Sequence, residues 1–162
     1  MKTAILILSD KGHHGEREDK SGPAIADFLN GIGAEIIAQD ILPDEIDQIE
    51  ERLKYYSDIM NVDLVLTSGG TGFSPRDYTP EATKKVIDRD APGIAEAMRQ
   101  ESLKITPHAM LSRAVSGIRN KTLIINLPGS PKACVECLET IKRALPHAIE
   151  VLCGSAEECA TD

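Results

Sequence analysis

Short apolar runs alternate along the chain with longer segments in which apolar residues recur every three or four positions. Four runs, at residues 3–8, 34–42, 62–67 and 122–127, are largely apolar, which is typical of strands buried on both faces of a parallel sheet. The segments between them have helical spacing. This alternation predicts an α/β fold of three layers, αβα, in which helices cover both faces of a doubly wound, mostly parallel sheet.

Capping residues and prolines indicate where the helices begin. The predicted starts are at Ser21, Pro43, Thr79, Pro92 and Ser130. Thr79 is interpreted as an N-cap, and its helix is expected to extend to about Arg89. The last helix is expected to break near Pro146. Residues 9–20 are predicted to form a polar loop, and residues 109–115 a short helix.

Length and composition fit a single domain. A chain of 162 residues with 41% hydrophobic content is large enough to bury about 70% of the surface that it exposes when unfolded. The sequence contains no low-complexity segment and no internal repeat of useful length. Residues 1–154 are predicted to form this domain, and residues 155–162, which are rich in small and acidic side chains, are predicted to form a flexible tail.

The charge balance argues against nucleic acid as a partner. The 18 basic and 26 acidic residues leave a net charge of −8, whereas nucleic-acid-binding proteins present a positive surface. Three tyrosines and two phenylalanines offer few platforms for stacking bases. The apolar run at residues 4–8 is too short for a secretory signal or a membrane span. We therefore expect a cytoplasmic protein with no membrane partner.

Two glycine-rich turns directly follow apolar runs. They are Ser68-Gly69-Gly70-Thr71-Gly72 and Pro128-Gly129-Ser130-Pro131. At the end of a parallel strand, a turn without side chains lets backbone N–H groups approach an anion, and the dipole of the next helix adds positive potential. Together the two turns indicate a phosphate-bearing ligand. The structural alternative is that the glycines only allow tight turns.

Neither turn matches a standard nucleotide-binding signature. The first turn continues as Phe73-Ser74, so it lacks the lysine of a P-loop, and the third glycine of a dinucleotide fingerprint is absent as well. Hydride chemistry on a nicotinamide is therefore disfavoured.

Three acidic residues fall where a sheet of this kind binds its ligand. In open α/β sheets ligands lie beyond the carboxyl ends of the strands, and Asp10, Asp44 and Asp77 belong to that rim. Mg²⁺ prefers one or two carboxylates together with phosphate oxygens and water, so Asp44 and Asp77 are candidate metal ligands. Each has a structural alternative, because Asp44 suits a helix start and Asp77 suits a turn cap or a partner for Arg76.

The cysteines suggest packing more strongly than metal binding. Cys134 and Cys137 have the C-x-x-C spacing of zinc and redox sites. They also fall on an apolar helical stripe, and Cys153 and Cys159 are too far apart to form a second close ligand pair. We interpret the first two as packing residues.

A longer set of motifs resembles one family. The motifs are Ser68-Gly69-Gly70-Thr71-Gly72-Phe73-Ser74-Pro75-Arg76-Asp77, Thr79-Pro80-Glu81-Ala82, Pro92-Gly93, Met110-Leu111-Ser112-Arg113 and Asn126-Leu127-Pro128-Gly129-Ser130-Pro131. With Ser9-Asp10, Ser21-Gly22 and Pro43-Asp44-Glu45, they resemble the molybdopterin adenylyltransferases, which are the Mog-type enzymes and the G domain of gephyrin-like proteins. The resemblance covers about residues 3–154.

The resemblance implies an activity and an assembly. The activity is Mg²⁺-dependent transfer of AMP from ATP to the phosphate of molybdopterin, with release of pyrophosphate, as a step of molybdenum cofactor biosynthesis. The resemblance also implies a homotrimer. Because this chain lacks a fused metal-insertion domain, insertion of molybdenum is left to a separate downstream protein. The family's two critical acids fall on Asp44 and Asp77, the same residues that the rim argument selects.

These arguments give one set of candidate site residues. Asp44 and Asp77 are the candidate catalytic and Mg²⁺-binding residues. The candidate substrate- or nucleotide-binding residues are Ser9, Asp10, Ser68, Gly69, Gly70, Thr71, Gly72, Ser112, Arg113, Pro128, Gly129 and Ser130.

Two other functions remain open from the sequence. One is a non-catalytic molybdopterin-binding or trimeric assembly module on the same fold, since a fold does not by itself determine a function. The other is a nucleotide-binding protein that acts on a different phosphate acceptor. The sequence does not indicate which turn holds the pterin and which holds the nucleotide.

Overall fold

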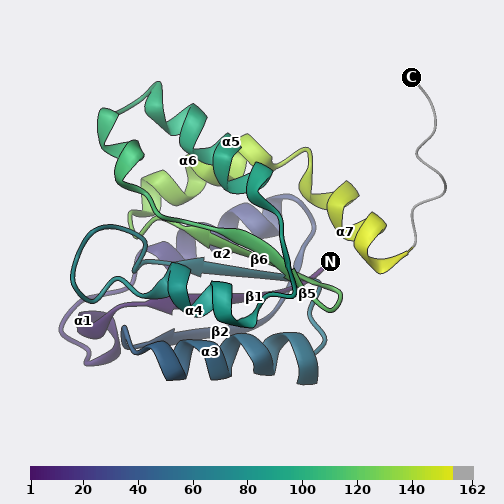
Figure 1. Cartoon of the computed structure of the whole chain (residues 1–162), viewed down its shortest axis with the longest axis horizontal. Coiled ribbons are helices and arrows are strands. Elements are labelled where there is room, and N and C mark those ends of the chain that lie inside the picture. Colours follow the sequence, from purple (N-terminus) through teal and green to yellow (C-terminus); the bar gives the residue numbers. More distant parts are fainter. Residues whose placement is uncertain (155–162) are drawn as a thin grey trace.

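Among residues 1–154, which are the residues that the computed structural model describes, six strands form one sheet in the order β2-β1-β3-β6-β5-β4 (Figure 1). They are β1 (Lys2–Leu8), β2 (Glu35–Leu42), β3 (Leu64–Ser68), β4 (Arg89–Asp90), β5 (Ser116–Arg119) and β6 (Thr122–Leu127). The first four in this order are parallel, whereas β5 runs antiparallel to β6 and to β4. The mostly parallel sheet is confirmed, and the expected tail at 155–162 lies outside the described residues.

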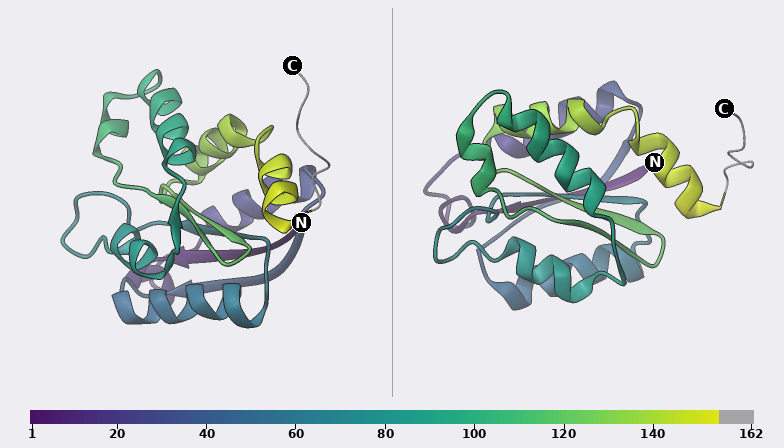
Figure 2. Two further views of the ribbon diagram at one scale, coloured as in Figure 1. Left: turned by 45° about the vertical axis from the view of Figure 1, so that its right-hand side comes forward. Right: turned by 45° about the horizontal axis from the view of Figure 1, so that its top comes forward.

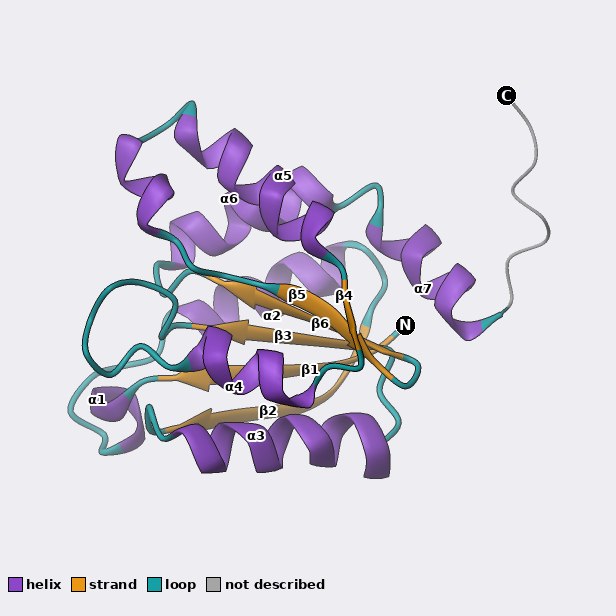
Figure 3. Ribbon diagram, viewed as in Figure 1, coloured by secondary structure: helices purple, strands orange, loops and turns teal. Residues whose placement is uncertain are grey.

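Helices cover both faces of the sheet (Figure 2 and Figure 3). One face packs against α2 (Ser21–Gly31), α5 (Pro92–Leu103), α6 (Pro131–Ile141) and α7 (Leu145–Cys153), and the other against α3 (Ile46–Lys54) and α4 (Thr79–Val86). Three short elements complete the set, namely α1 (Asp10–His13), a π-helical turn at Tyr55–Ile59 and a 3₁₀ helix at Pro107–Leu111. No described helix is long and apolar enough to cross a membrane.

The central strands supply both halves of the core because their side chains alternate between the two faces. In β1, Ile5 and Ile7 pack with the α2 side, whereas Ala4, Leu6 and Leu8 pack with the α3 side. β3 and β6 alternate in the same way. Burial on both faces explains why these strands are continuous apolar runs in the sequence.

Several predicted elements differ from the structure. The helix that begins at Thr79 ends at Val86, not at Arg89, and Arg89–Asp90 forms β4 instead. The helix predicted at residues 109–115 is a 3₁₀ helix that ends at Leu111, followed by strand β5, which the sequence pattern missed. The segment 9–20 contains the single turn α1.

The C-terminal helix breaks just before Pro146, close to where the sequence predicts the break. α6 ends at Ile141, and Pro146 lies in the first turn of α7. Proline is tolerated there because the N–H that it lacks has no helical acceptor.

The topology places the carboxyl ends of three strands at one edge. The register pairs Ile7 with Ser68 and Ser68 with Leu127, so β1, β3 and β6 end at the same level. From β1 the chain continues to β2 on one side and then crosses back to β3 on the other. A crevice is expected outside such a switch point, and ligands of open α/β sheets bind there. The connection from β3 to α4 is a wide loop at this edge (Figure 1).

Candidate active site

The two glycine turns lie side by side at the ends of β3 and β6. The Gly69 N–H donates to the carbonyl oxygen of Leu127 at 3.3 Å. The hydroxyl of Ser68 donates to the carbonyl oxygen of Pro128 at 2.9 Å, and that of Ser21 to the carbonyl oxygen of Gly129 at 2.9 Å. The second turn is therefore tied to the first turn and to the start of α2.

The first turn has a conformation and surroundings that exclude side chains. Gly69 has φ of +102° and Gly70 has φ of +62°, which non-glycine residues rarely adopt. A Cβ at Gly69 would overlap the carbonyl oxygen of Leu8, and one at Gly70 would overlap the hydroxyl of Thr79. A Cβ at Gly70 would also lie 3.0 Å from Asp44 Oδ1. The candidate catalytic carboxylate thus lies beside the turn and leaves no room for a side chain at Gly70.

Thr79 anchors the first turn from the start of α4. Its hydroxyl donates to the carbonyl oxygen of Gly69 at 2.9 Å, and its N–H donates to that of Gly70 at 3.1 Å. The prediction that Thr79 is the N-cap is wrong, because Tyr78 occupies that position. The Thr79 hydroxyl bonds to the glycine turn instead of to its own helix.

Three backbone N–H groups of the first turn are available to a ligand. Within residues 1–154, the N–H groups of Gly70, Thr71 and Gly72 donate to no protein acceptor. Successive N–H groups in a turn with positive φ form an anion-binding concavity. This arrangement agrees with the anion-binding role that the sequence predicts for the turn.

Asp10 and Asp44 are joined by reciprocal hydrogen bonds. The Asp10 N–H donates to Asp44 Oδ2 at 3.1 Å, and the Asp44 N–H donates to Asp10 Oδ1 at 3.0 Å. Arg76 donates to both carboxylate oxygens of Asp10, at 2.6 and 3.0 Å, and to Glu45. The Arg76 guanidinium lowers the pKa of Asp10. Arg76 thus pairs with Asp10 and not with Asp77.

Asp44 has the features of a cation ligand. Its Oδ1 is buried and has no hydrogen-bond donor within the described part of the chain. Burial raises the pKa of Asp44, and the negative charges of Asp10 and Asp77 raise it further. A buried, unpaired carboxylate oxygen is costly unless a cation or a donor meets it. Asp44 Oδ1 therefore fits the role of a cation ligand.

Asp77 belongs to a local turn that its own side chain closes. Its Oδ2 accepts from the Ser74 N–H at 3.1 Å, and its N–H donates to the carbonyl oxygen of Ser74 at 3.0 Å. The turn-capping alternative is thus correct for Oδ2, although Asp77 also lines both cavities described below.

A polar cavity of about 580 Å³ lies on one side of the first turn. Ser9, Asp44 and Ser68 line it, together with Arg17 and Lys20 from the segment before α2 and Ser21 at the start of α2. Neither Arg17 nor Lys20 forms an ion pair with a described residue. Arg17 and Lys20, beside the free N–H groups, are donors suited to phosphate oxygens, and the carboxylates of Glu18 and Asp19 line the same cavity.

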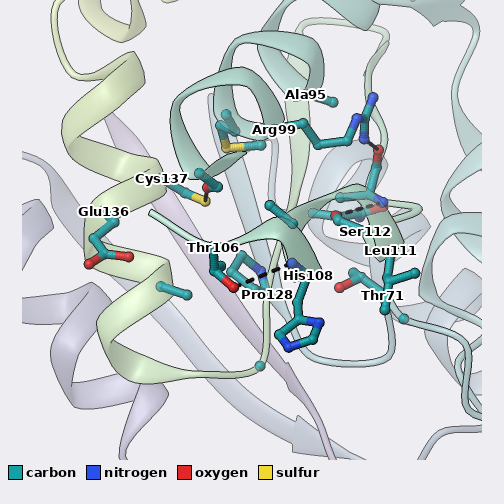
Figure 4. A pocket seen from close by; sticks show the side chains of 18 of the residues that line it. Thr71, Ala95, Arg99, Thr106, His108, Leu111, Ser112, Pro128, Glu136 and Cys137 are labelled. Carbon is teal, nitrogen blue, oxygen red and sulfur yellow. Dashed lines mark hydrogen bonds between the residues drawn. The ribbon is translucent and has the colours of Figure 1, made fainter. Parts of the chain in front are cut away.

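An apolar cavity of about 450 Å³ lies on the other side, between α5, the 3₁₀ helix and α6 (Figure 4). Thr71, Ser112 and Pro128 line it, as do Leu111 and Cys137. Arg99 adds a cation to this wall, with one guanidinium nitrogen donating to the carbonyl oxygen of Ala114 at 2.7 Å. Such a cavity with a few polar groups suits a ring system that carries a charged substituent.

The two cavities share four lining residues. Gly69, Gly70, Asp77 and Gly129 belong to both. Ligands in the two cavities would therefore meet at the first turn, beside the candidate catalytic carboxylates.

Most of the predicted site residues come together in these walls. The residues that line one or both cavities are Ser9, Asp44, Ser68, Gly69, Gly70, Thr71, Gly72, Asp77, Ser112, Pro128 and Gly129. Asp10, Arg113 and Ser130 line neither cavity. Asp10 instead supports Asp44, and Ser130 occupies the N-cap position of α6.

Three cationic residues of the cavities were missed as site residues. Arg17 and Lys20 lie in a segment predicted only as a polar loop, and Arg99 lies on a helix predicted from its apolar spacing. Their role depends on the path of the chain through space. The basic residues just before the predicted start at Ser21 were the available signal.

The cysteines of α6 pack as predicted. Cys134 is fully buried and Cys137 is 5% exposed. The Cys134 thiol donates to the carbonyl oxygen of Pro128 at 2.9 Å, and burial raises its pKa to about 12. Within the described range, no three or more His, Cys, Asp or Glu side chains are grouped as a metal site.

Comparison with known proteins places the chain in a family. Residues 4–147 match the family described as a probable molybdopterin binding domain. The chain belongs to this family. A relative from Helicobacter pylori, named molybdopterin adenylyltransferase, is 46% identical over 153 residues, which cover 93% of this chain and 87% of the relative. A protein of the same name from Escherichia coli is 39% identical and covers 100% of this chain and 90% of its own length.

A solved structure of the family agrees with the fold. The molybdopterin biosynthesis enzyme MoaB from Thermus thermophilus has a TM-score of 0.90 and 48% identity, over 94% of this chain and 96% of that protein. The predicted family and fold are thereby confirmed, and the chain is a homologue of proteins of molybdenum cofactor biosynthesis.

Proposed function

We propose that this protein transfers AMP from ATP to the phosphate group of molybdopterin. A phosphate oxygen of molybdopterin attacks the α-phosphorus of ATP and forms a new P–O bond. The bond between the α-phosphorus and the oxygen bridging to the β-phosphorus breaks, and pyrophosphate leaves. The names of the relatives support this reaction. The observation that carries it is the meeting of two cavities at a glycine turn beside Asp44, whose carboxylate has one buried, unpaired oxygen.

The chain's own groups account for binding both phosphates. The free N–H groups of Gly70, Thr71 and Gly72 are available to phosphate oxygens at the reacting centre, where preorganised donors stabilise developing charge. Arg17 and Lys20 are suited to hold the remaining phosphates of ATP. Since two phosphates repel each other, holding both in place supplies much of the catalysis.

Asp44 and Asp77 are the residues that would hold Mg²⁺. Two carboxylates fit its preference for few protein ligands and several phosphate or water oxygens. When bound, the ion would neutralise phosphate charge at the reacting centre. Asp10 and Arg76 keep Asp44 in place through the hydrogen bonds around it.

The apolar cavity is suited to one of the two ring systems, the pterin or the adenine. It opens onto the shared turn, so a ring bound in it would place its phosphate beside Asp77. Arg99 and Ser112 are among the polar groups available for orienting that substrate.

We further propose a cytoplasmic homotrimer that passes its product to a separate molybdenum-insertion protein. Exposed apolar side chains near the site, Phe73, Ile105 and Met110, support an assembly that covers them. Light scattering is expected to give a mass three times that of one chain. A monomer with full activity would contradict the trimer and leave the chemistry intact.

One incubation tests the reaction. The protein is mixed with molybdopterin, Mg²⁺ and ATP labelled at the α-phosphorus, and the label is expected to appear in adenylyl-molybdopterin while unlabelled pyrophosphate is released. Omission of Mg²⁺ is expected to stop the transfer. Binding of both substrates without label transfer would instead favour the non-catalytic module, and label on another acceptor would favour a different nucleotidyl transfer.

A further inference from the structure

Arg113 contacts both ends of the loop that carries Asp77. It lies between the 3₁₀ helix and β5. Its N–H donates to the carbonyl oxygen of Thr71 at 2.8 Å. Its Nε donates to the carbonyl oxygen of Gly72 at 2.7 Å, and its Nη2 donates to that of Asp77. One side chain therefore bridges the two ends of the segment 72–77.

Glu81 fixes the orientation of this guanidinium. The Nη1 of Arg113 donates to Glu81 Oε1, in the first turn of α4. The other oxygen of Glu81 is buried and accepts no hydrogen bond from the described residues. Each of the three guanidinium nitrogens thus has a protein acceptor. The rigid fork of arginine suits such a bridge, whereas the single ammonium of lysine does not.

The segment that Arg113 bridges is itself a closed turn. The Ser74 N–H donates to Asp77 Oδ2, and the Asp77 N–H donates to the Ser74 carbonyl oxygen. These bonds set the direction of the Asp77 side chain relative to its own loop. Arg113 then fixes the position of the loop relative to the glycine turn and α4. Its contacts with Gly72, Asp77 and Glu81, together with the closed turn, determine where the Asp77 carboxylate lies.

We infer that Arg113 is a positioning residue for Asp77 and does not bind a substrate. This revises the role that the sequence predicts, because Arg113 lines neither cavity and its guanidinium is occupied by Gly72, Asp77 and Glu81. The inference rests on the proposed function only for the role of Asp77 in the reaction. The contacts that carry it do not depend on that role.

Arg119 offers a matched control. Its guanidinium also binds one carboxylate, that of Asp58, and one carbonyl oxygen, that of Val86 at 2.8 Å. Arg119 pairs with Thr122 at the start of β6, so it lies at the edge of the sheet opposite to the site. Arg119→Ala therefore removes a similar bridge without touching the loop of Asp77.

Amide hydrogen exchange tests the bridge without reference to activity. In Arg113→Ala, amide exchange at Ser74 and Asp77 is expected to become about tenfold faster. Local opening of the loop in the wild type requires the bridge to be broken, and the variant has no bridge to break. Arg119→Ala is expected to leave these two amides unchanged. Arg113→Lys retains a charge for Glu81 and serves if the alanine variant does not fold. It is expected to show the same faster exchange. Unchanged exchange in a folded Arg113 variant would overturn the inference.

Kinetics separate positioning from substrate binding. We expect kcat for adenylyl transfer to fall about thirtyfold in Arg113→Ala, with KM for ATP and for molybdopterin changed less than about twofold. Added guanidinium ion is expected to restore part of kcat. A raised KM with unchanged kcat would show that Arg113 binds a substrate and would overturn the inference. If the wild type transfers no AMP, the proposed function fails, and the exchange comparison alone decides the role of Arg113.

Discussion

The two glycine turns look alike in the sequence, but they differ in what the fold requires of them. In the first turn, Gly69 and Gly70 have positive φ, and a Cβ at either would overlap a neighbouring oxygen atom. In the second turn, Gly129 has no positive φ, and its Cβ would make an ordinary contact, 3.5 Å from Gly69 Cα. The first turn requires glycine for folding, whereas the second leaves space that a ligand can use.

The supporting contacts are alike, because each turn is held through its carbonyl oxygens. Thr79 holds the first turn through its hydroxyl and its N–H. The second turn is held through its carbonyl oxygens by Ser21, Ser68 and Cys134. Among the described residues, the N–H groups of Gly70, Thr71 and Gly72 in the first turn, and those of Gly129 and Ser130 in the second, donate to no acceptor. A glycine at a strand end can thus allow a backbone conformation that other residues rarely adopt, leave room for a ligand, or do both.

The largest expected loss of stability is that of Gly69→Ala. The methyl group must displace the backbone at Leu8 while the residue keeps a φ of +102°, so we expect the free energy of unfolding to fall by about 3 kcal/mol. Urea denaturation measures this change. Gly31→Ala is the control, because a Cβ there meets no atom within 4 Å. A loss below about 1 kcal/mol for Gly69→Ala would show that this turn is not strained.

Cys134→Ala is expected to have the next largest effect. It removes a fully buried thiol and its hydrogen bond to Pro128, and a loss of about 1–2 kcal/mol is typical of such a change. Adenylyl transfer is expected to persist, because Ser68 still binds the Pro128 carbonyl oxygen. Stoichiometric zinc in the purified protein, lost together with activity in this variant, would contradict the packing role.

The central half of the fold could be predicted because its signals are local. β1, β3 and β6 are buried on both faces, so they are uninterrupted apolar runs in the sequence. β5 was missed because Gly117 and Arg119 interrupt the apolar pattern, and because its partners are the adjacent β6 and the two-residue β4. Pairing with neighbouring strands, which local pattern does not report, stabilises it.

The site residues that directly follow strands could be predicted from the sequence. Asp44 and Asp77 follow strands whose carboxyl ends meet, and the structure places both in the polar cavity. The contribution of Arg17, Lys20 and Arg99 depends on how a loop and a helix fold back over the sheet. Thr79 has the sequence context of an N-cap, yet its hydroxyl donates to the nearby carbonyl oxygen of Gly69. Tertiary contacts override local signals at such positions.

Asp44→Asn is expected to raise the free energy of unfolding slightly, whereas Gly69→Ala and Cys134→Ala are expected to lower it. Burial raises the pKa of Asp44 in the folded state above its ordinary value of 3.8. Between 3.8 and the folded pKa, the folded state therefore binds a proton at Asp44 more strongly than the unfolded state does. Stability falls as the pH rises through this range. A neutral amide removes this penalty. We expect a gain below about 1 kcal/mol at neutral pH, after allowance for solvent screening, together with loss of adenylyl transfer. A destabilised variant with normal turnover would contradict the cation-ligand assignment.

Gly129→Ala is expected to have the smallest effect on stability, within about 0.5 kcal/mol. Because Gly129 lines both cavities, the methyl group is nevertheless expected to weaken ATP binding about fivefold, which calorimetry measures. Loss of stability comparable to that of Gly69→Ala would show that both turns carry the same constraint.

The most direct test of the account is the rate of AMP transfer to molybdopterin by the wild type and by Asp77→Asn. An asparagine preserves the size of the side chain and an oxygen acceptor for the Ser74 N–H, so the fold is expected to persist. Without the negative charge at the shared wall of the two cavities, we expect the rate to fall about a hundredfold, or about 3 kcal/mol of transition-state stabilisation. Equal rates in the two proteins, or no transfer by the wild type, would contradict the assignment of this turn as the catalytic centre.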